Sequence, residues 1–161
     1  MKDFKLSYIK DISSKKQKHT QPSDGNFSSQ TSSTSYSDVS GTDFSFDCDT
    51  ISGYSKVIFE ISIQTGSGPD GYRNIGDMKL LESSDQTNWS DIDKSKVRIS
   101  MTASYHNSTF EHKFTLDPWS GTKYFKLQIK SSSSNADFTI NRRGWDAHPW
   151  QSPPIINARV I

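Results

Sequence analysis

Several features that mark whole classes of protein are scarce or missing in this sequence. Only one cysteine, Cys48, occurs in 161 residues, so no disulfide can form within the chain. No apolar run has the length of a signal peptide or of a membrane span. Lys and Arg number 19 against 18 Asp and Glu, and this balance gives no general attraction to nucleic acid or to an anionic membrane. We therefore expect a chain made in the cytoplasm, with no nucleic-acid partner and no membrane insertion.

Signatures of catalysis and metal binding are missing as well. The sequence has no G-x-S-x-G motif and no Gly-rich loop followed by a helix. Cys48 lies between Asp47 and Asp49, whose negative charges raise the pKa of the thiol and weaken it as a nucleophile. The four histidines lack the spacing of a metal site, and the loop aspartates fit turn formation better than a calcium loop. We expect no enzyme, no cofactor and no metal.

Polar residues dominate what is present. Hydrophobic residues make up 31% of the chain, and Ser and Thr together about a quarter. Such a composition predicts strands with one polar face and a thin core. A neighbouring chain is then expected to help bury that core.

Apolar residues alternate with polar ones in one segment after another from about residue 30, and no helical period of useful length occurs. The stretch SKVIFEISIQT places Val57, Phe59, Ile61 and Ile63 on one face. Gly, Ser, Asp and Pro turns separate eight or nine such short segments. The pattern predicts an all-β fold, an antiparallel β-sandwich over residues 26–161.

Residues 1–25 differ from the rest because they combine lysines with a short alternating apolar pattern. Two interpretations remain open: a solvated tail, or an extended basic arm that lies on a neighbour and adds a strand to it. We favour the arm, since a tail without a partner has no need for the apolar side chains. The residues expected to anchor it are Phe4, Leu6, Tyr8, Ile9, Lys15, Lys16 and Lys18.

Two stretches resemble motifs of discoidin-like jelly-roll domains. LLESSDQTNWSDI resembles a hairpin of the pattern S-x-D-G-x-x-W-x-x-I, in which Asp85 begins a tight turn, Trp89 folds back over the hairpin and Ile92 returns to the core. This chain has Gln86 where the pattern prefers glycine. GTKYFKLQI is similar to a strand that contains Tyr124, Phe125 and Leu127 and has Lys126 in place of the usual arginine.

Together with SDVSGTDFSF and SKVIFEIS, these stretches resemble β-sandwich domains of bacteriophage and other virion surface proteins. The resemblance implies a jelly-roll-like head, a homotrimer, and a structural role in the virion as a capsid decoration protein or a tail-fibre head. Other capsid or tail proteins would be its partners, the arm would dock it, and exposed loops would serve host attachment.

A carbohydrate-binding module of the discoidin-like kind is the alternative, with a host surface glycan as ligand. Tryptophan rings stack on sugars, while Asp and His side chains bind hydroxyls. The stretch GWDAHPW near the C-terminus fits either this role or simple packing at a corner or an interface. The candidate ligand-binding residues are Trp119, Trp145, Asp146, His148 and Trp150.

Overall fold

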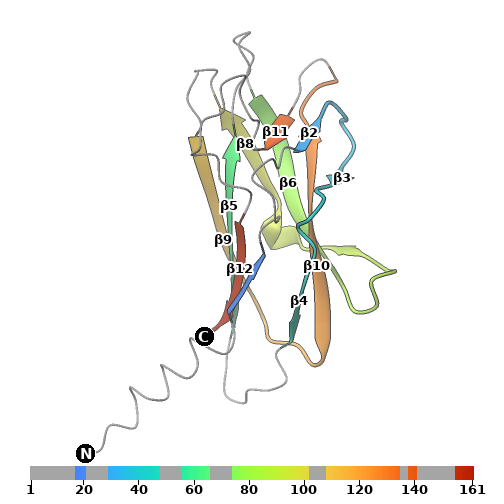
Figure 1. The fold of residues 1–161 in the computed structure, drawn as a ribbon, viewed down its shortest axis with the longest axis vertical. Helices are drawn as coiled ribbons and strands as arrows, with labels where there is room; N and C mark the ends of the chain where they lie inside the picture. Colours follow the sequence, from blue (N-terminus) through green and yellow to red (C-terminus); the bar gives the residue numbers. More distant parts are fainter. Residues whose placement is uncertain are drawn as a thin grey trace, which may run out of the picture.

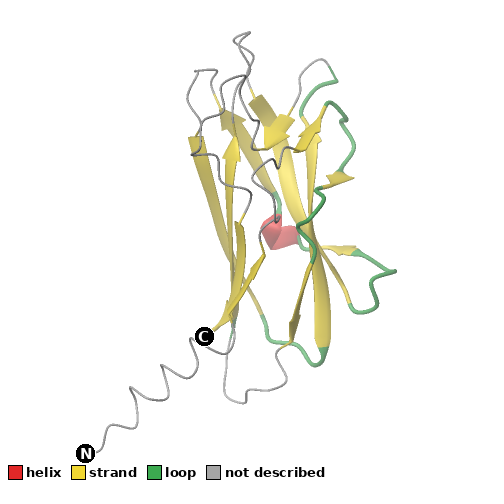
Figure 2. Ribbon diagram, in the orientation of Figure 1, coloured by secondary structure: helices red, strands yellow, loops and turns green. Residues whose placement is uncertain are grey.

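Two antiparallel β-sheets packed face to face form the protein (Figure 1). The computed structural model describes residues 17–20, 29–47, 56–65, 74–101, 108–134, 138–140 and 155–161. Apart from one 3-10 turn, η1 (Asp93–Ser95), the regular structure of these residues is strand, as Figure 2 shows by colour. No helix in the described part of the chain is long and apolar enough to cross a membrane.

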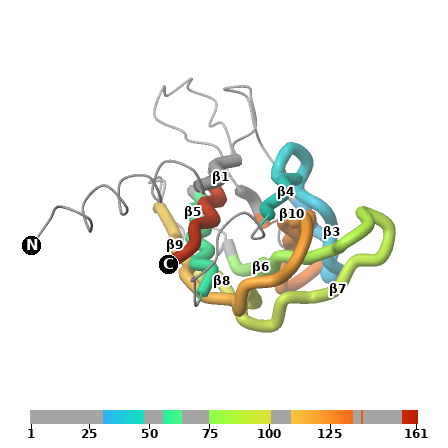
Figure 3. Tube along the Cα trace, turned by 90° about the horizontal axis from the view of Figure 1, so that it is seen from below, coloured from blue at the N-terminus to red at the C-terminus, as the bar shows by residue number. Residues whose placement is uncertain are grey.

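The first sheet, sheet A, has six strands. They are β1 (Gln17–Thr20), β2 (Ser29–Thr31), β5 (Val57–Thr65), β9 (Ser108–Leu116), β11 (Phe138–Ile140) and β12 (Ile155–Val160). Sheet B also has six. They are β3 (Ser37–Asp38), β4 (Phe44–Asp47), β6 (Asn74–Ser83), β7 (Ser90–Asp91), β8 (Val97–Met101) and β10 (Thr122–Ser131). Figure 3, seen from below, separates the two layers.

The strand order is that of a jelly roll. In sheet A, β1 pairs with β12 and β2 with β11, while β11 and β12 both pair with β5, which pairs with β9. In sheet B, β3 and β4 both pair with β10, then β6 follows, then β7 and β8. The twelve segments occupy eight strand positions, because β1 and β2 share the first, β3 and β4 the second, β7 and β8 the fifth, and β11 and β12 the eighth. Sheet A then has the order first, eighth, third, sixth. Sheet B has the order second, seventh, fourth, fifth. This is the double Greek key of a jelly roll, and it confirms the predicted all-β sandwich.

The core lies between the sheets and is rich in phenylalanine. The alternating residues predicted to face inward do so: Val57, Phe59, Ile61 and Ile63 of β5 are at most 1% exposed. The Phe59 ring lies 5.0 Å from Phe125 of the opposite sheet, centroid to centroid. Aromatic pairs of this kind add about 0.5–1.5 kcal/mol beyond their buried area. Large aromatic rings therefore offset the low apolar content of the sequence in this core.

Part of the arm predicted over residues 1–25 lies in sheet A. Gln17–Thr20 form β1, which is hydrogen-bonded to β12 of the same chain, with Lys18 opposite Ala158. The added strand therefore completes its own sheet rather than that of a neighbour. The terminal strand β12 likewise pairs with β5 within the chain. The other predicted anchors, Phe4, Leu6, Tyr8, Ile9, Lys15 and Lys16, lie outside the described residues.

Candidate functional site

The turn after β6 is organised by one carboxylate. Asp85 accepts hydrogen bonds from the backbone N–H groups of Asn88 and Thr87, both at 2.8 Å, and from the Asn88 amide at 2.7 Å and the Ser83 hydroxyl at 2.9 Å. These bonds, the backbone bond from Asn88 first, lower the pKa of Asp85 well below its usual range. Gln86 adopts a φ of 62°, the left-handed conformation that glycine favours. Gln86 thus occupies a conformation that glycine adopts more easily.

Trp89 has one contact with its own turn and one with sheet B. Its Nε1–H donates to the backbone oxygen of Gln86 at 3.1 Å, and Lys126 Nζ lies 4.3 Å from the centroid of its ring system. Lys126 also donates to Asp38 at 2.7 Å, and Gln128 donates to the other oxygen of Asp38 at 2.6 Å. Partial burial alone would raise the pKa of Asp38, but these two hydrogen bonds outweigh it and lower the pKa. Lys126 therefore contacts both the Asp38 carboxylate and the Trp89 ring.

Asp91 joins two lysines on the same outer face of sheet B. Its carboxylate lies 2.5 Å from Lys79 Nζ and 3.0 Å from Lys96 Nζ. The hydrogen bond from Lys79 is the largest cause that lowers the pKa of Asp91. Lys96 also binds Asp93 at 2.7 Å, and the Asp93 and Asp91 carboxylates raise the pKa of Lys96.

Asp77 and Tyr36 extend this arrangement toward the other end of β6. Asp77 lies 3.1 Å from Arg98 Nε and 3.3 Å from Lys130 Nζ. The Tyr36 ring has Lys79 Nζ at 4.2 Å and Lys130 Nζ at 4.9 Å from its centroid, and burial raises the pKa of its hydroxyl.

We call this surface the charged face. It comprises Tyr36, Asp38, Asp77, Lys79, Trp89, Asp91, Lys96, Arg98, Lys126 and Lys130. Each of its carboxylates accepts from at least one cationic side chain, which favours recognition of a polar partner over acid–base chemistry. The sequence places Lys126 and Lys130 on one face of their strand, but only the strand register pairs them with Asp38 and Asp77.

Trp119, a candidate ligand-binding residue, lies next to the core. Its indole is half-buried at the end of the sandwich, where Nε1–H donates to the backbone oxygen of Phe46 at 3.3 Å. Its ring lies 5.5 Å from Phe125 and 5.9 Å from Phe46, centroid to centroid. Lys123 Nζ lies 5.3 Å from the ring centroid. Trp119 therefore packs against the core, and its role as a sugar platform stays a prediction that this geometry does not support.

The GWDAHPW stretch, with Trp145, Asp146, His148 and Trp150, lies outside the described residues. The described strands on either side of it both pair with β5. Ile140, the last residue of β11, pairs with Thr65, and Ile155, the first residue of β12, pairs with Ser62. The stretch is thus an insertion between the two halves of one strand position of the jelly roll.

Among the described residues, no group of three or more His, Cys, Asp or Glu side chains is arranged to hold a metal ion. Comparison with known protein families gives no matching family model, and comparison with curated proteins gives no match.

Proposed function

We propose that this chain is a structural protein of a virion, a capsid decoration protein or a tail-fibre head, which docks through its N-terminal segment and presents the sandwich outward. The observation that carries the proposal is the place of β1 within a jelly-roll fold. Viral capsid proteins are prominent users of this fold, although fold alone does not assign function.

The N-terminal segment enters the sandwich at an edge. Within the described part of sheet A, β1 is the outermost strand and pairs with β12 alone. Gln17, the first residue of β1, lies opposite Arg159, near the end of the sheet where Lys56 and Ile161 exchange backbone hydrogen bonds. A segment that enters at an edge is free to bind a second protein without disturbing the core.

The charged face lies on the other sheet. A partner held through the N-terminal segment at the edge of sheet A leaves the outer face of sheet B exposed. Acidic and basic side chains, joined in ion pairs, keep that face polar, which suits a surface that stays in water. The head therefore has one side for docking and one for contact with the medium or with a host.

Mass spectrometry of purified virus particles from the culture that carries this gene tests the assignment. We expect peptides of the chain in density-purified particles at a fixed ratio to the major capsid protein. Presence of the chain in the lysate but not in the particles would overturn the proposal.

Two truncations test the docking role, and β1 sets where they end. Deletion of residues 1–16 leaves β1 in place, whereas deletion of residues 1–20 also removes the strand that covers β12. We expect the shorter deletion to keep the melting temperature of the intact chain and to lose incorporation into particles. Undiminished incorporation of that folded variant would refute docking through the segment. The longer deletion lacks the same segment and β1 as well, so its lower melting temperature marks the loss of stability that the shorter deletion should not show.

The discoidin-like hairpin geometry supports the alternative, a carbohydrate-binding module. Since Trp89 and Trp119 are engaged in internal contacts, this role rests on Trp145 and Trp150. Tryptophan fluorescence titrations across a glycan panel, with Trp150→Ala as control, test it. A response that the control abolishes would support sugar binding, and flat titrations would remove it.

A further inference from the structure

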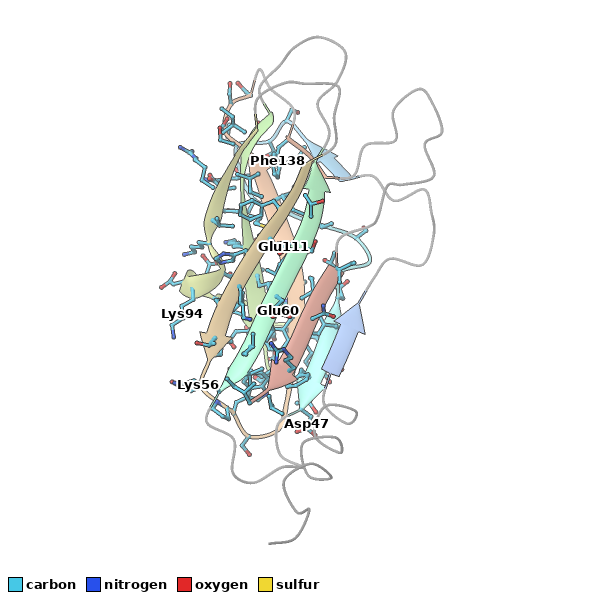
Figure 4. All side chains as sticks on the ribbon, turned by 90° about the vertical axis from the view of Figure 1, so that its left-hand side faces the viewer. Asp47, Lys56, Glu60, Lys94, Glu111 and Phe138 are labelled. Carbon is cyan, nitrogen blue, oxygen red and sulfur yellow. The ribbon has the colours of Figure 1, made fainter. Side chains whose placement is uncertain are left out.

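Among the described residues, β9 has a strand partner on one side only, and the turn η1 contacts it through Lys94. The strand pairs with β5 over its whole length, from Ser108 opposite Thr65 to Leu116 opposite Val57. Within the described residues, no strand pairs with its other side. Figure 4 shows this long edge, with Glu111 on β9, Glu60 on β5 and Lys94 beside the strand. At nine residues, β9 offers more backbone than short, protected edge strands usually do.

The register shows which backbone groups of β9 face the open edge. Lys56 and Ile161 exchange two hydrogen bonds, so every second residue of β5 from there turns its backbone groups toward β12. The β9 residues opposite those positions must turn their groups away from β5. These residues are Thr109, Glu111, Lys113 and Thr115. In agreement, the backbone oxygen of Thr115 accepts a hydrogen bond from Lys94 Nζ at 3.3 Å rather than from β5.

The sequence of β9 is complementary to itself. His112 is the central residue of the strand, and an antiparallel copy placed on a two-fold axis through His112 aligns all nine residues. Glu111 then faces Lys113 of the second copy, and Lys113 faces Glu111. Both belong to the set with outward backbone groups, so the same register satisfies the backbone and the charges.

Two other kinds of pair in this register also match. Thr109 faces Thr115 of the second copy, a pair of β-branched residues that suits a strand. On the inner side, Phe110 faces Phe114 of the second copy. Phe110 packs against the core but is only partly buried, so a second strand would cover its exposed part.

We propose that two copies of the chain join edge to edge through β9, in the register centred on His112, so that the two A sheets become one continuous sheet. The pairing is isologous, the form that two-fold dimers require. Lys94 releases the Thr115 oxygen as the second strand docks. The competing explanation is that Glu111 and Lys113 only keep the edge soluble, as charges on edge strands do. The pairing stands or falls independently of the virion assignment.

Size-exclusion chromatography with light scattering tests it with charge reversals. The intact chain is expected at twice its mass of 18.2 kDa. Glu111→Lys and Lys113→Glu each place like charges opposite one another twice, and each should weaken the dimer by about tenfold or more. A mixture of the two variants restores both pairs, because one strand then carries two lysines and the other two glutamates. We expect the mixture to form heterodimers.

Arg159→Glu is the matched control. Arg159 and Lys113 both bind Glu60, at 3.3 and 2.9 Å, on the same outer face of sheet A, but Arg159 lies on β12 away from the open edge. The control should dimerise like the intact chain, and circular dichroism should show all variants folded. A monomer or a trimer at every concentration would overturn the proposal. So would a dimer that Lys113→Glu leaves intact, or a mixture of the two reversals that stays monomeric.

Discussion

Replacement of Gly76 by alanine tests a close contact between the two sheets. Gly76 lies on β6, opposite Ser131 of β10, with Phe138 of sheet A against it. A Cβ at this position would lie 2.3 and 2.5 Å from two carbons of the Phe138 ring and 2.6 Å from the backbone oxygen of Lys130. Carbon atoms in ordinary contact are about 3.5–4.0 Å apart. The added methyl group therefore has no room.

Neither neighbour can move aside freely. The Phe138 side chain is fully buried, and the Lys130 oxygen belongs to the backbone of β10. Overpacking of a core costs typically 1–3 kcal/mol, and a backbone clash places Gly76→Ala near 3 kcal/mol. Loss of glycine's freedom in the unfolded chain returns up to about 1 kcal/mol. The net loss of about 2 kcal/mol lowers the melting temperature of a chain of this size by about 4–8 °C.

Urea denaturation followed by tryptophan fluorescence measures this change. Gly121→Ala is the control with a different mechanism, since Gly121 has a φ of 76° and an alanine Cβ there would meet no atom of the described residues, apart from its chain neighbours, within 4 Å. It should lose about 1–2 kcal/mol through its left-handed backbone alone. Phe138→Leu should relieve the clash in combination with Gly76→Ala, so the double variant should lose less than the sum of the singles. A Gly76→Ala protein within about 0.5 kcal/mol of the intact chain, or strict additivity, would refute the reasoning.

Two further changes probe buried and turn hydrogen bonds. The fully buried Thr42 hydroxyl donates to the Val39 oxygen at 2.6 Å and accepts from the Leu127 N–H at 3.2 Å, so Thr42→Val should cost about 1–3 kcal/mol, whereas Thr42→Ser keeps both bonds and should cost less. Urea midpoints that rank Thr42→Ser below Thr42→Val would contradict this. Because the folded-state pKa of Asp85 is depressed, its stabilising effect is present above the ordinary pKa of about 4 and is lost as the pH falls through the folded-state value. The melting temperature of Asp85→Asn should therefore lie below that of the intact chain at neutral pH and approach it in acid. A difference in melting temperature that does not change with pH would disprove the role of the charge.

Inward-facing residues of the long strands were predictable because side chains alternate across a strand whatever its neighbours are. Phe125, Leu127 and Ile129 follow this rule over β10 and are at most 1% exposed. The hairpin around Asp85 was predictable for a similar reason, since its hydrogen bonds join residues at most three positions apart. Gln86 takes the left-handed conformation there, so the local bonds outweigh its preference against it.

Other features depended on partners far away in the sequence. The sequence places Trp119 in a loop, and only the fold shows that the core of the sandwich lies directly beside it. The early start of the fold at Gln17 was missed because a four-residue strand of polar side chains carries no hydrophobic signal and is held by backbone bonds to β12.

The sequence by itself determined which residues face the core and where the turns fall, because strand periodicity and turn chemistry act over a few neighbouring residues. Only the tertiary structure decided the strand order, the pairing of charges across sheet B and the open side of β9. Each of these depends on the register between strands up to about a hundred residues apart, as with Asp38 and Lys126, 88 positions apart, or Glu60 and Arg159, 99 apart. Periodicity fixes which way a side chain points, and register fixes what it meets.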